Sequence, residues 1–199
     1  MTKITKKGQE TKQAILRAAK TILLNDGIGA LSVEAVCTAV GLSKGSFFYH
    51  FKTREELLKD LLVSLTEHQT QLFEKFSAED QTEYGRGLRS YIRAMLSMTG
   101  KDRDNARAAC RCMMEMLLTR TDMLNDFGMK PGFYEDLLLS EEMTNGLSPK
   151  QALLALLACE GLWYDQSLGV QGIHTGKIQP AIDAIIEMTY AKDEDRPRF

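Results

Sequence analysis

Residues 44–52 combine side-chain types that suit contact with a nucleic acid. The segment reads Lys44-Gly45-Ser46-Phe47-Phe48-Tyr49-His50-Phe51-Lys52. A lysine ammonium and a serine hydroxyl can donate hydrogen bonds to base edges, so Lys44 and Ser46 are candidates for reading base sequence. Tyr49 and His50 suit phosphates or a thymine methyl group better.

A helix over 44–51 would sort these side chains onto two faces. Because each helical residue turns by about 100°, Phe47 and Phe51 share one face and can pack against Val36 and Val40 of the preceding helix. The opposite face then carries the residues suited to a major groove. These are Gly45, Ser46 and Tyr49, flanked by Lys44, Phe48 and His50.

Gly45 stands near the start of this expected helix. Glycine inside a helix costs about 1 kcal/mol relative to alanine, so its presence indicates that the backbone comes close to another molecule. The alternative is a loosely specified surface turn.

Two short helices joined by a glycine turn would position this segment. Ser32 can cap a helix ending at residue 40, and Ser43 can cap the next, because a serine hydroxyl accepts from unpaired backbone N–H groups. Gly41 supplies the tight turn between them. Ser32 and Ser43, together with Lys52 and Arg54, stand at helix starts that favour phosphate.

The charge of the chain is distributed unevenly. Residues 1–54 hold nine lysines and arginines against three acidic residues, whereas residues 55–199 hold 16 against 24. A basic lobe on an acidic body indicates that the first segment meets a polyanion. A solvated charged tail is the alternative.

Apolar residues recur at three- and four-residue steps, and period-two alternation is missing, so we expect an all-α protein. The spacing Thr53-x-x-Glu56 opens a leucine-rich helix, and Ser148-Pro149 with Gln151 is a strong helix start. The expected helices cover 10–25, 33–40, 44–51, 53–76, 84–98, 105–120, 131–145, 149–168 and 178–191. Breaks are expected near Gly100, Gly128, Gly146 and 172–176.

Residues 10–57 resemble the DNA-binding segment of the tetracycline-repressor (TetR) family. The resemblance is carried by Val40-Gly41-Leu42-Ser43-Lys44-Gly45-Ser46-Phe47-Phe48-Tyr49-His50-Phe51-Lys52-Thr53-Arg54-Glu55-Glu56-Leu57. Family members commonly carry tyrosine where this chain has Phe48, so a hydroxyl directed at phosphate is missing there. Phe48 can still touch a sugar or a thymine methyl group.

The resemblance implies a helix-turn-helix DNA-binding domain at 1–52 and a helical regulatory and dimerisation domain at 53–199. It also implies a homodimeric repressor that binds an operator in double-stranded DNA and is released by a small-molecule effector. The effector would move the 53–76 helix and change the separation of the recognition helices.

The 149–168 segment is apolar nearly all round, so it must be covered on more than one side. Together with the 178–190 segment it could form a four-helix bundle across a two-fold axis. The expected interface residues are Leu153, Leu156, Leu157, Ile182, Ile185 and Ile186. A fully intramolecular core is the alternative.

A malleable apolar pocket is a further expectation, which rests on the resemblance more than on the residues. Methionine and aromatic side chains adapt to varied ligands, although at helical spacing they are more often plain core. The candidates are Met95, Met98, Cys110, Met113, Met114, Phe127, Phe133, Tyr134 and Trp163. The Cys110-x-Cys112 spacing leaves a redox role open.

Other function classes find little support in the sequence. We expect no enzyme, because a nucleophile elbow, a phosphate loop and a metal-ligand cluster are all missing. His50, His68 and His174 have no ligand spacing, so we expect no metal and no other cofactor. Apolar runs are far shorter than the roughly 20 residues of a membrane span, and the chain is interpreted as cytoplasmic with reduced thiols. The main rival is a helical ligand-binding or scaffold protein with a non-functional DNA-binding module.

Overall fold

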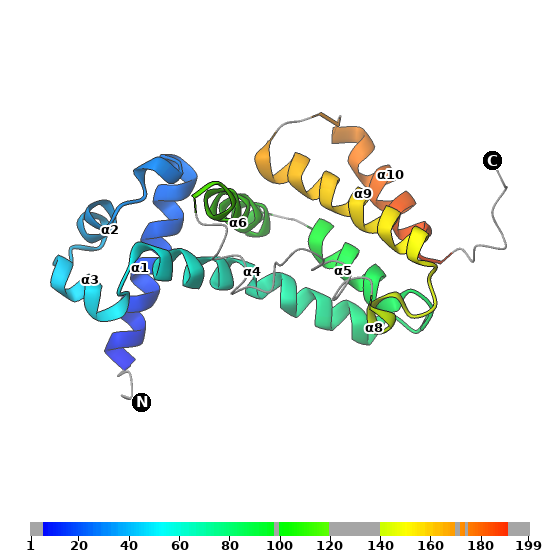
Figure 1. The fold of residues 1–199 in the computed structure, drawn as a ribbon, viewed down its shortest axis with the longest axis horizontal. Coiled ribbons are helices and arrows are strands. Elements are labelled where there is room, and N and C mark those ends of the chain that lie inside the picture. The colour runs from blue at the N-terminus through cyan, green and yellow to red at the C-terminus, as the bar shows by residue number, and fades with distance from the viewer. Residues whose placement is uncertain (1–5, 98–99, 120–139, 170–171, 174, 191–199) are drawn as a thin grey trace. The chain divides into compact units, whose positions relative to one another are not determined.

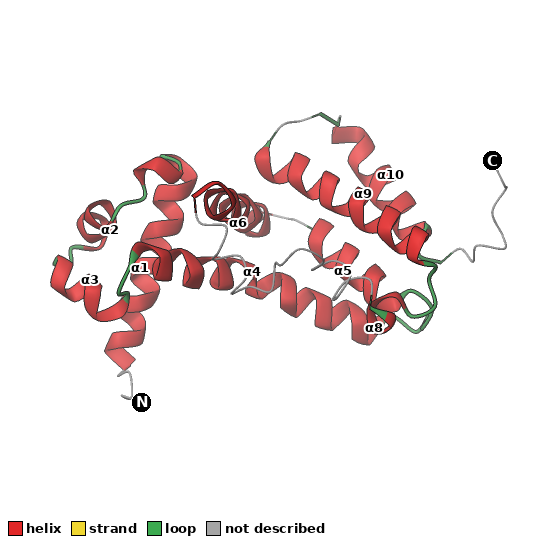
Figure 2. Ribbon diagram, viewed as in Figure 1, coloured by secondary structure: helices red, strands yellow, loops and turns green. Residues whose placement is uncertain are grey.

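A computed structural model describes residues 6–97, 100–119, 140–169, 172–173 and 175–190, and all regular structure in them is helical (Figures 1 and 2). The all-α prediction is therefore confirmed for this part of the chain. In chain order the elements are α1 (Lys6–Asn25), the 3-10 turn η1 (Ile28–Ala30), α2 (Val33–Val40), α3 (Lys44–His50), α4 (Arg54–Glu79), α5 (Arg86–Leu96), α6 (Gly100–Thr119), α8 (Glu141–Thr144), α9 (Pro149–Leu168) and α10 (Thr175–Glu187).

The chain divides into two compact units. The first comprises Met1–Thr66 and Asp104–Arg120, and the second comprises Glu67–Arg103 and Thr121–Phe199. In the first unit α1 packs against α2 and α3. Ile15, Ala19 and Leu23 recur every four residues along α1 and are fully buried, which makes this the core-facing side of the helix.

Serine and glycine shape the turn between α2 and α3. Ser32 and Ser43 cap the two helices, accepting from the backbone N–H groups of Ala35 and Ser46 at 3.1 Å each. Gly41 ends α2 in the left-handed region, with φ +71°, which other residues adopt only with strain. These caps, all expected from the sequence, fix the direction in which α3 leaves the turn.

The C-terminal part of α6 belongs to the first unit and ties down α1. The last turn of α1 has no basic residue of its own. Arg111 of α6 instead donates to the carbonyl oxygen of Leu24 at 2.9 Å and also to that of Leu23. A guanidinium at this end satisfies unpaired carbonyls and complements the negative end of the helix dipole.

In the second unit α5 packs against α8, α9 and α10, and α9 packs against α10. A Cβ on Gly87 of α5 would lie 2.6 Å from the carbonyl oxygen of Met143, so only glycine permits this approach to α8. At the start of α9, Ser148 and Gln151 form the expected capping box, and Pro149 occupies the first helical position. Gly169 ends the helix with φ +70°.

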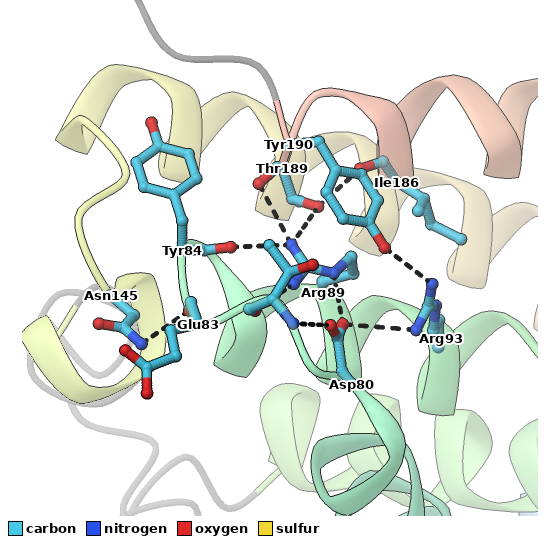
Figure 3. Close-up of polar contacts among 10 residues, drawn as sticks. Asp80, Glu83, Tyr84, Arg89, Arg93, Asn145, Ile186, Thr189 and Tyr190 are labelled. Carbon is cyan, nitrogen blue, oxygen red and sulfur yellow. Dashed lines mark hydrogen bonds and ion pairs between the residues drawn. The ribbon is translucent and has the colours of Figure 1, made fainter.

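A buried arginine holds one end of the second unit together (Figure 3). Arg89 of α5 is 0% exposed, and its Nε donates to Asp80 Oδ2 at 2.5 Å. Nη1 donates to the carbonyl oxygen of Tyr84 at 3.0 Å and to two oxygens of Thr189 at 3.3 Å. Nη2 donates to the carbonyl oxygen of Thr82 at 2.7 Å. The hydrogen bonds join the residue after α4 to α5 and to the segment after α10.

The charge of this cluster is also compensated. Burial alone would raise the pKa of Asp80, but hydrogen bonds from Arg89 and from the Thr82 backbone outweigh it, together with the charges of Arg89 and Arg93, and lower that pKa. The Arg89 guanidinium carbon lies 4.0 Å from the centroid of the Tyr190 ring. Arg93 donates to the Tyr190 hydroxyl oxygen at 3.2 Å. No pattern in the sequence pointed to this cluster.

The structure corrects several expected helix boundaries. α6 begins at Gly100, whereas the sequence predicted a break there and a helix from residue 105. α10 begins at Thr175, so Gly176 lies inside a helix and not in the expected break. α5 is shorter than the expected 84–98, because Gly85 precedes it at φ +69° and Ser97 follows it. Most of the expected 131–145 helix lies outside the described residues, and Asn145 at φ +44° ends the short α8.

Candidate nucleic-acid interface

Two phenylalanines orient α3. Phe47 and Phe51 are both 0% exposed, and their ring centroids are 5.7 Å apart. The Lys12 ammonium of α1 lies 5.2 Å from the centroid of the Phe51 ring. The prediction that these two rings point inward is confirmed, whereas their expected partner Val40 is only half-buried. α3 is therefore fixed with its opposite face outward.

That outward face carries most of the predicted contact residues. Tyr49 is 69% exposed and Phe48 is 42% exposed, and Lys44 and Gly45 are exposed as well. Ser46 is half-buried, and Ser43 is exposed while its hydroxyl caps the helix. The structure thus brings the predicted recognition residues onto one surface (α3, Figure 1).

Gly45 has no structural reason within the chain to be glycine. Its φ is not positive, and a Cβ built there would meet only the Ser43 hydroxyl oxygen, at 3.9 Å. Alanine would fit this space and would favour the helix by about 1 kcal/mol. The described residues thus give no steric reason for glycine here, and an approach of another molecule to this backbone stays a prediction.

Lys44 has an acidic neighbour that sequence spacing did not reveal. Its Nζ forms an ion pair with Glu34 Oε1 in the first turn of α2. The hydrogen bond from Lys44, with further help from the backbone and the Lys44 charge, lowers the pKa of Glu34. The same hydrogen bond and the charge of Glu34 raise the pKa of Lys44. Both groups are therefore ionised at neutral pH.

His50 is half-buried, and its ring lies edge-on to Tyr49 at 5.2 Å between centroids. Burial lowers the pKa of His50, and the charge of Lys12 lowers it further. The imidazole is therefore neutral at pH 7 in the free protein and offers a hydrogen bond and no charge.

Two predicted phosphate contacts have partners inside the chain. Arg54 Nε donates to the carbonyl oxygen of Leu31 at 2.9 Å, and both Nη atoms donate to Glu115 Oε1 at 3.2 Å. Lys52 Nζ donates to the carbonyl oxygen of Phe48 at 3.0 Å. Arg54 thus joins the start of α4 to α6, and Lys52 caps the end of α3. Sequence spacing alone gives no sign of these partners, and a phosphate contact of either residue stays a prediction.

Comparisons with known proteins agree with this geometry. Residues 15–61 match the model of the family described as bacterial regulatory proteins, tetR family. The N-terminal part of the chain is therefore similar to the DNA-binding segment of the tetR family.

Curated relatives resemble the N-terminal part of the chain. The HTH-type transcriptional regulator TtgR of Pseudomonas putida is 29% identical over 75 residues, which are 38% of this chain and 36% of the relative. UidR of Escherichia coli is 31% identical over 55 residues, or 28% of each chain. The matches thus span about a third of these relatives' length.

Solved structures extend the likeness in fold to most of the chain. The multidrug binding protein EbrR, complexed with imidazole, has a TM-score of 0.65 at 19% identity and covers 92% of this chain and 98% of its own. A transcriptional regulator from Rhodococcus sp. Rha1 has a TM-score of 0.69 at 17% identity, over 90% and 95%. These likenesses support the all-helical arrangement of an N-terminal helix-turn-helix and a C-terminal helical part.

The residues expected to line a ligand pocket are divided between the two units. Met95 and Trp163 belong to the second unit, whereas Cys110, Met113 and Met114 belong to the first. The other four lie outside the described residues: Met98, Phe127, Phe133 and Tyr134. A pocket built from them stays a prediction.

The cysteines of α6 are poorly suited to redox chemistry. Cys110 and Cys112 are both buried at 0% exposure. Burial raises the pKa of Cys110 to about 11 and that of Cys112 to about 12, and the charges of Arg111 and Arg54 offset this only in part. Both are thiols at neutral pH, so they lack the thiolate that reacts with oxidants.

The residues expected at a dimer interface separate into two groups. Leu153 and Leu157 are 42% and 57% exposed, next to the exposed Leu154. Leu156, Ile182 and Ile185 are instead buried within one chain, in the unit where α5, α9 and α10 pack together, and Ile186 is half-buried. The outer face of α9 is therefore available to a second copy, and the inner face is occupied. No described helix is long and apolar enough to cross a membrane.

Proposed function

We propose that this chain is a dimeric transcriptional regulator that binds an operator through α3 and is released by a small-molecule effector. The observation that carries the proposal is the orientation of α3, with Phe47 and Phe51 buried and Tyr49 exposed on the other side. A helix held in this way can enter a major groove without unfolding any part of the core.

The exposed side chains of α3 and of its flanks differ in the DNA groups that they can contact. Lys44 and Ser46 donate to base edges, and Tyr49 and Phe48 contact sugar, phosphate or a thymine methyl group. His50, neutral in the free protein, donates one hydrogen bond. Ser32 and Ser43 stand at helix starts whose N–H groups attract phosphate. Gly45 leaves room for the DNA backbone.

We propose that two chains pair through the outer face of α9. Leu153, Leu154 and Leu157 give this face an apolar character that water does not favour. Pairing would place two α3 helices in successive major grooves, about 34–36 Å apart. The functional division is then the one expected from the sequence, with DNA binding in residues 1–52 and regulation and pairing in 53–199.

The effector acts by preferring an arrangement of the dimer that binds DNA poorly. Such couplings are typically about 1–3 kcal/mol, which is roughly 5- to 150-fold in operator affinity. We propose repression relieved in this way in the bacterial cytoplasm. Operator titrations in the presence of candidate small molecules or extract fractions test this part, and affinity that never changes would contradict it.

Selection of bound duplexes from a random pool tests DNA binding and pairing together. We expect an inverted repeat with half-site centres roughly 10 base pairs apart. A Lys44→Ala/Tyr49→Ala protein, selected in parallel, should recover no motif. A single unrepeated half-site would contradict pairing, and a pool without any enrichment would indicate a helical protein whose DNA-binding module does not function.

A further inference from the structure

The ion pair between Glu34 and Lys44 links the two helices of the helix-turn-helix. Glu34 lies in the first turn of α2, and Lys44 is the first residue of α3. Their side chains are 64% and 59% exposed, so the ion pair is open to solvent. Lys44 is also one of the two residues expected to read base edges.

Glu34 is unusual in its surroundings. It is the only acidic residue between positions 27 and 54, a segment that contains Lys44, Lys52 and Arg54. A carboxylate at this place is repelled by phosphates, yet it stands in the first turn of α2, which otherwise attracts them. It is therefore a feature that weakens contact with DNA in general.

Because of this ion pair, DNA must compete with the Glu34 carboxylate for the Lys44 ammonium. When α3 approaches a duplex, Lys44 must leave the Glu34 carboxylate before it can bind the DNA, and Glu34 then faces a polyanion without its partner. A single phosphate contact gains little from this exchange, because it replaces one anion by another. At the operator, a guanine edge offers the ammonium two acceptors at O6 and N7, and this contact forms together with the other sequence-specific contacts of α3, which offset the loss of the ion pair.

We propose that Glu34 is a specificity-determining residue, a built-in competitor that holds Lys44 away from the phosphates of non-operator DNA. This inference rests on the proposed DNA-binding function. It assigns to Glu34 no direct contact with DNA and no role in folding α3, which Phe47 and Phe51 hold in place.

The test compares Glu34→Gln with the unchanged protein on a selected operator and on a scrambled duplex of equal length. Glu34→Gln should bind the scrambled duplex roughly threefold to tenfold more tightly and the operator by a smaller factor, so that the specificity ratio falls. The difference should shrink as salt rises, because salt screens an exposed ion pair. Glu74→Gln removes the same charge from an exposed position on α4 and should leave both affinities nearly unchanged.

A double-mutant cycle shows whether Lys44 mediates the effect. In a Lys44→Gln background the gain from Glu34→Gln should be clearly smaller, because only the direct repulsion between Glu34 and the phosphates remains. A gain of the same size in both backgrounds would overturn the proposal, because Glu34 would then act by general repulsion. A Glu34→Gln protein with weaker operator binding would overturn it too, since Glu34 would then position Lys44 or read a base itself.

Two measurements distinguish a failure of this inference from a folding defect and from a failure of the proposed function. The thermal midpoint of Glu34→Gln should stay close to that of the unchanged protein, because Ser32 still caps α2. An unchanged protein that binds operator and scrambled duplex equally would contradict the proposed function itself. A protein that prefers its operator, with Glu34→Gln indistinguishable from it, would contradict only the role of Glu34.

Discussion

At the scale of single residues, α3 shows how one short segment serves two purposes. Two neighbouring phenylalanines lie on opposite sides of the helix, since Phe47 is 0% exposed and Phe48 is 42% exposed. The inward ring builds the core of the first unit, and the outward ring lies on the candidate interface. The difference follows from the 100° turn per helical residue and was predictable from the sequence.

Replacing the two rings should therefore have different effects on stability. Phe47→Ala leaves a cavity in a packed core and should lower the free energy of unfolding by about 3–5 kcal/mol. Phe48→Ala, the matched control on the same helix, should cost about 1 kcal/mol or less. Denaturant unfolding at one fixed protein concentration measures both. Equal losses would contradict the orientation of α3.

The thiols of α6 give a second prediction at this scale. With the pKa of Cys110 near 11 and that of Cys112 near 12, both stay protonated and covered at neutral pH. A thiol reagent should therefore modify neither in the folded protein and both after denaturation. Mass spectrometry of digested protein locates the label, and rapid labelling of either residue in the folded protein would restore a redox role.

At the scale of elements, the Arg89 cluster anchors the end of α4 to α5 and to the segment after α10 (Figure 3). Arg89→Met removes one partner of a buried ion pair and should lower the free energy of unfolding by about 3–5 kcal/mol, because Asp80 stays buried. Arg103→Met, at an exposed position on α6, should change it by about 0.5 kcal/mol or less. A small effect of Arg89→Met would show that the cluster contributes little.

The same cluster predicts a pH dependence. Because the pKa of Asp80 is lower in the folded chain than in the unfolded one, its carboxylate stabilises the fold fully above the ordinary aspartate pKa, about 3.9. That contribution should disappear as the pH falls through the lowered folded value. Asp80→Asn should remove this acid-induced loss of stability, and an unchanged pH profile below about pH 4 would contradict the assignment.

Local signals predicted the starts and ends of several helices well. Ser32, Gly41, Ser43 and the Ser148 capping box all act at short range, and the structure contains each of them. Contacts between distant residues were not predictable in this way. Arg54 bonds to Glu115, 61 positions later, and Arg89 bonds to Thr189, 100 positions later, so neither could be placed without the fold.

At the scale of the whole molecule, helical periodicity did not predict which apolar residues pack within one chain. Leu156, Ile182 and Ile185 were expected at a dimer interface, but they are buried within the chain. A helix that is apolar nearly all round has an inner and an outer face, and its sequence does not distinguish them. In the structure those three residues are buried in the unit formed by α5, α9 and α10, whereas Leu153, Leu154 and Leu157 are exposed.

Pairing through the outer face of α9 can be tested with charge. Leu157→Glu should convert a dimer into a monomer, because a carboxylate buried without a partner strongly disfavours association. Val63→Glu, on α4, is the matched control, because Val63 and Leu157 are both 57% exposed. Sedimentation equilibrium gives the mass of each, and a Leu157→Glu protein that stays dimeric would place the interface elsewhere.

The central claim is that the outward face of α3 binds duplex DNA, and a salt titration of operator affinity tests it most directly. The unchanged protein should lose affinity steeply with salt, and Lys44→Ala should bind the operator more weakly by about 1–3 kcal/mol, because a base contact is lost. Lys101→Ala, an exposed lysine of the second unit, should match the unchanged protein. If Lys44→Ala bound with unchanged affinity, α3 would not be the helix that meets the DNA.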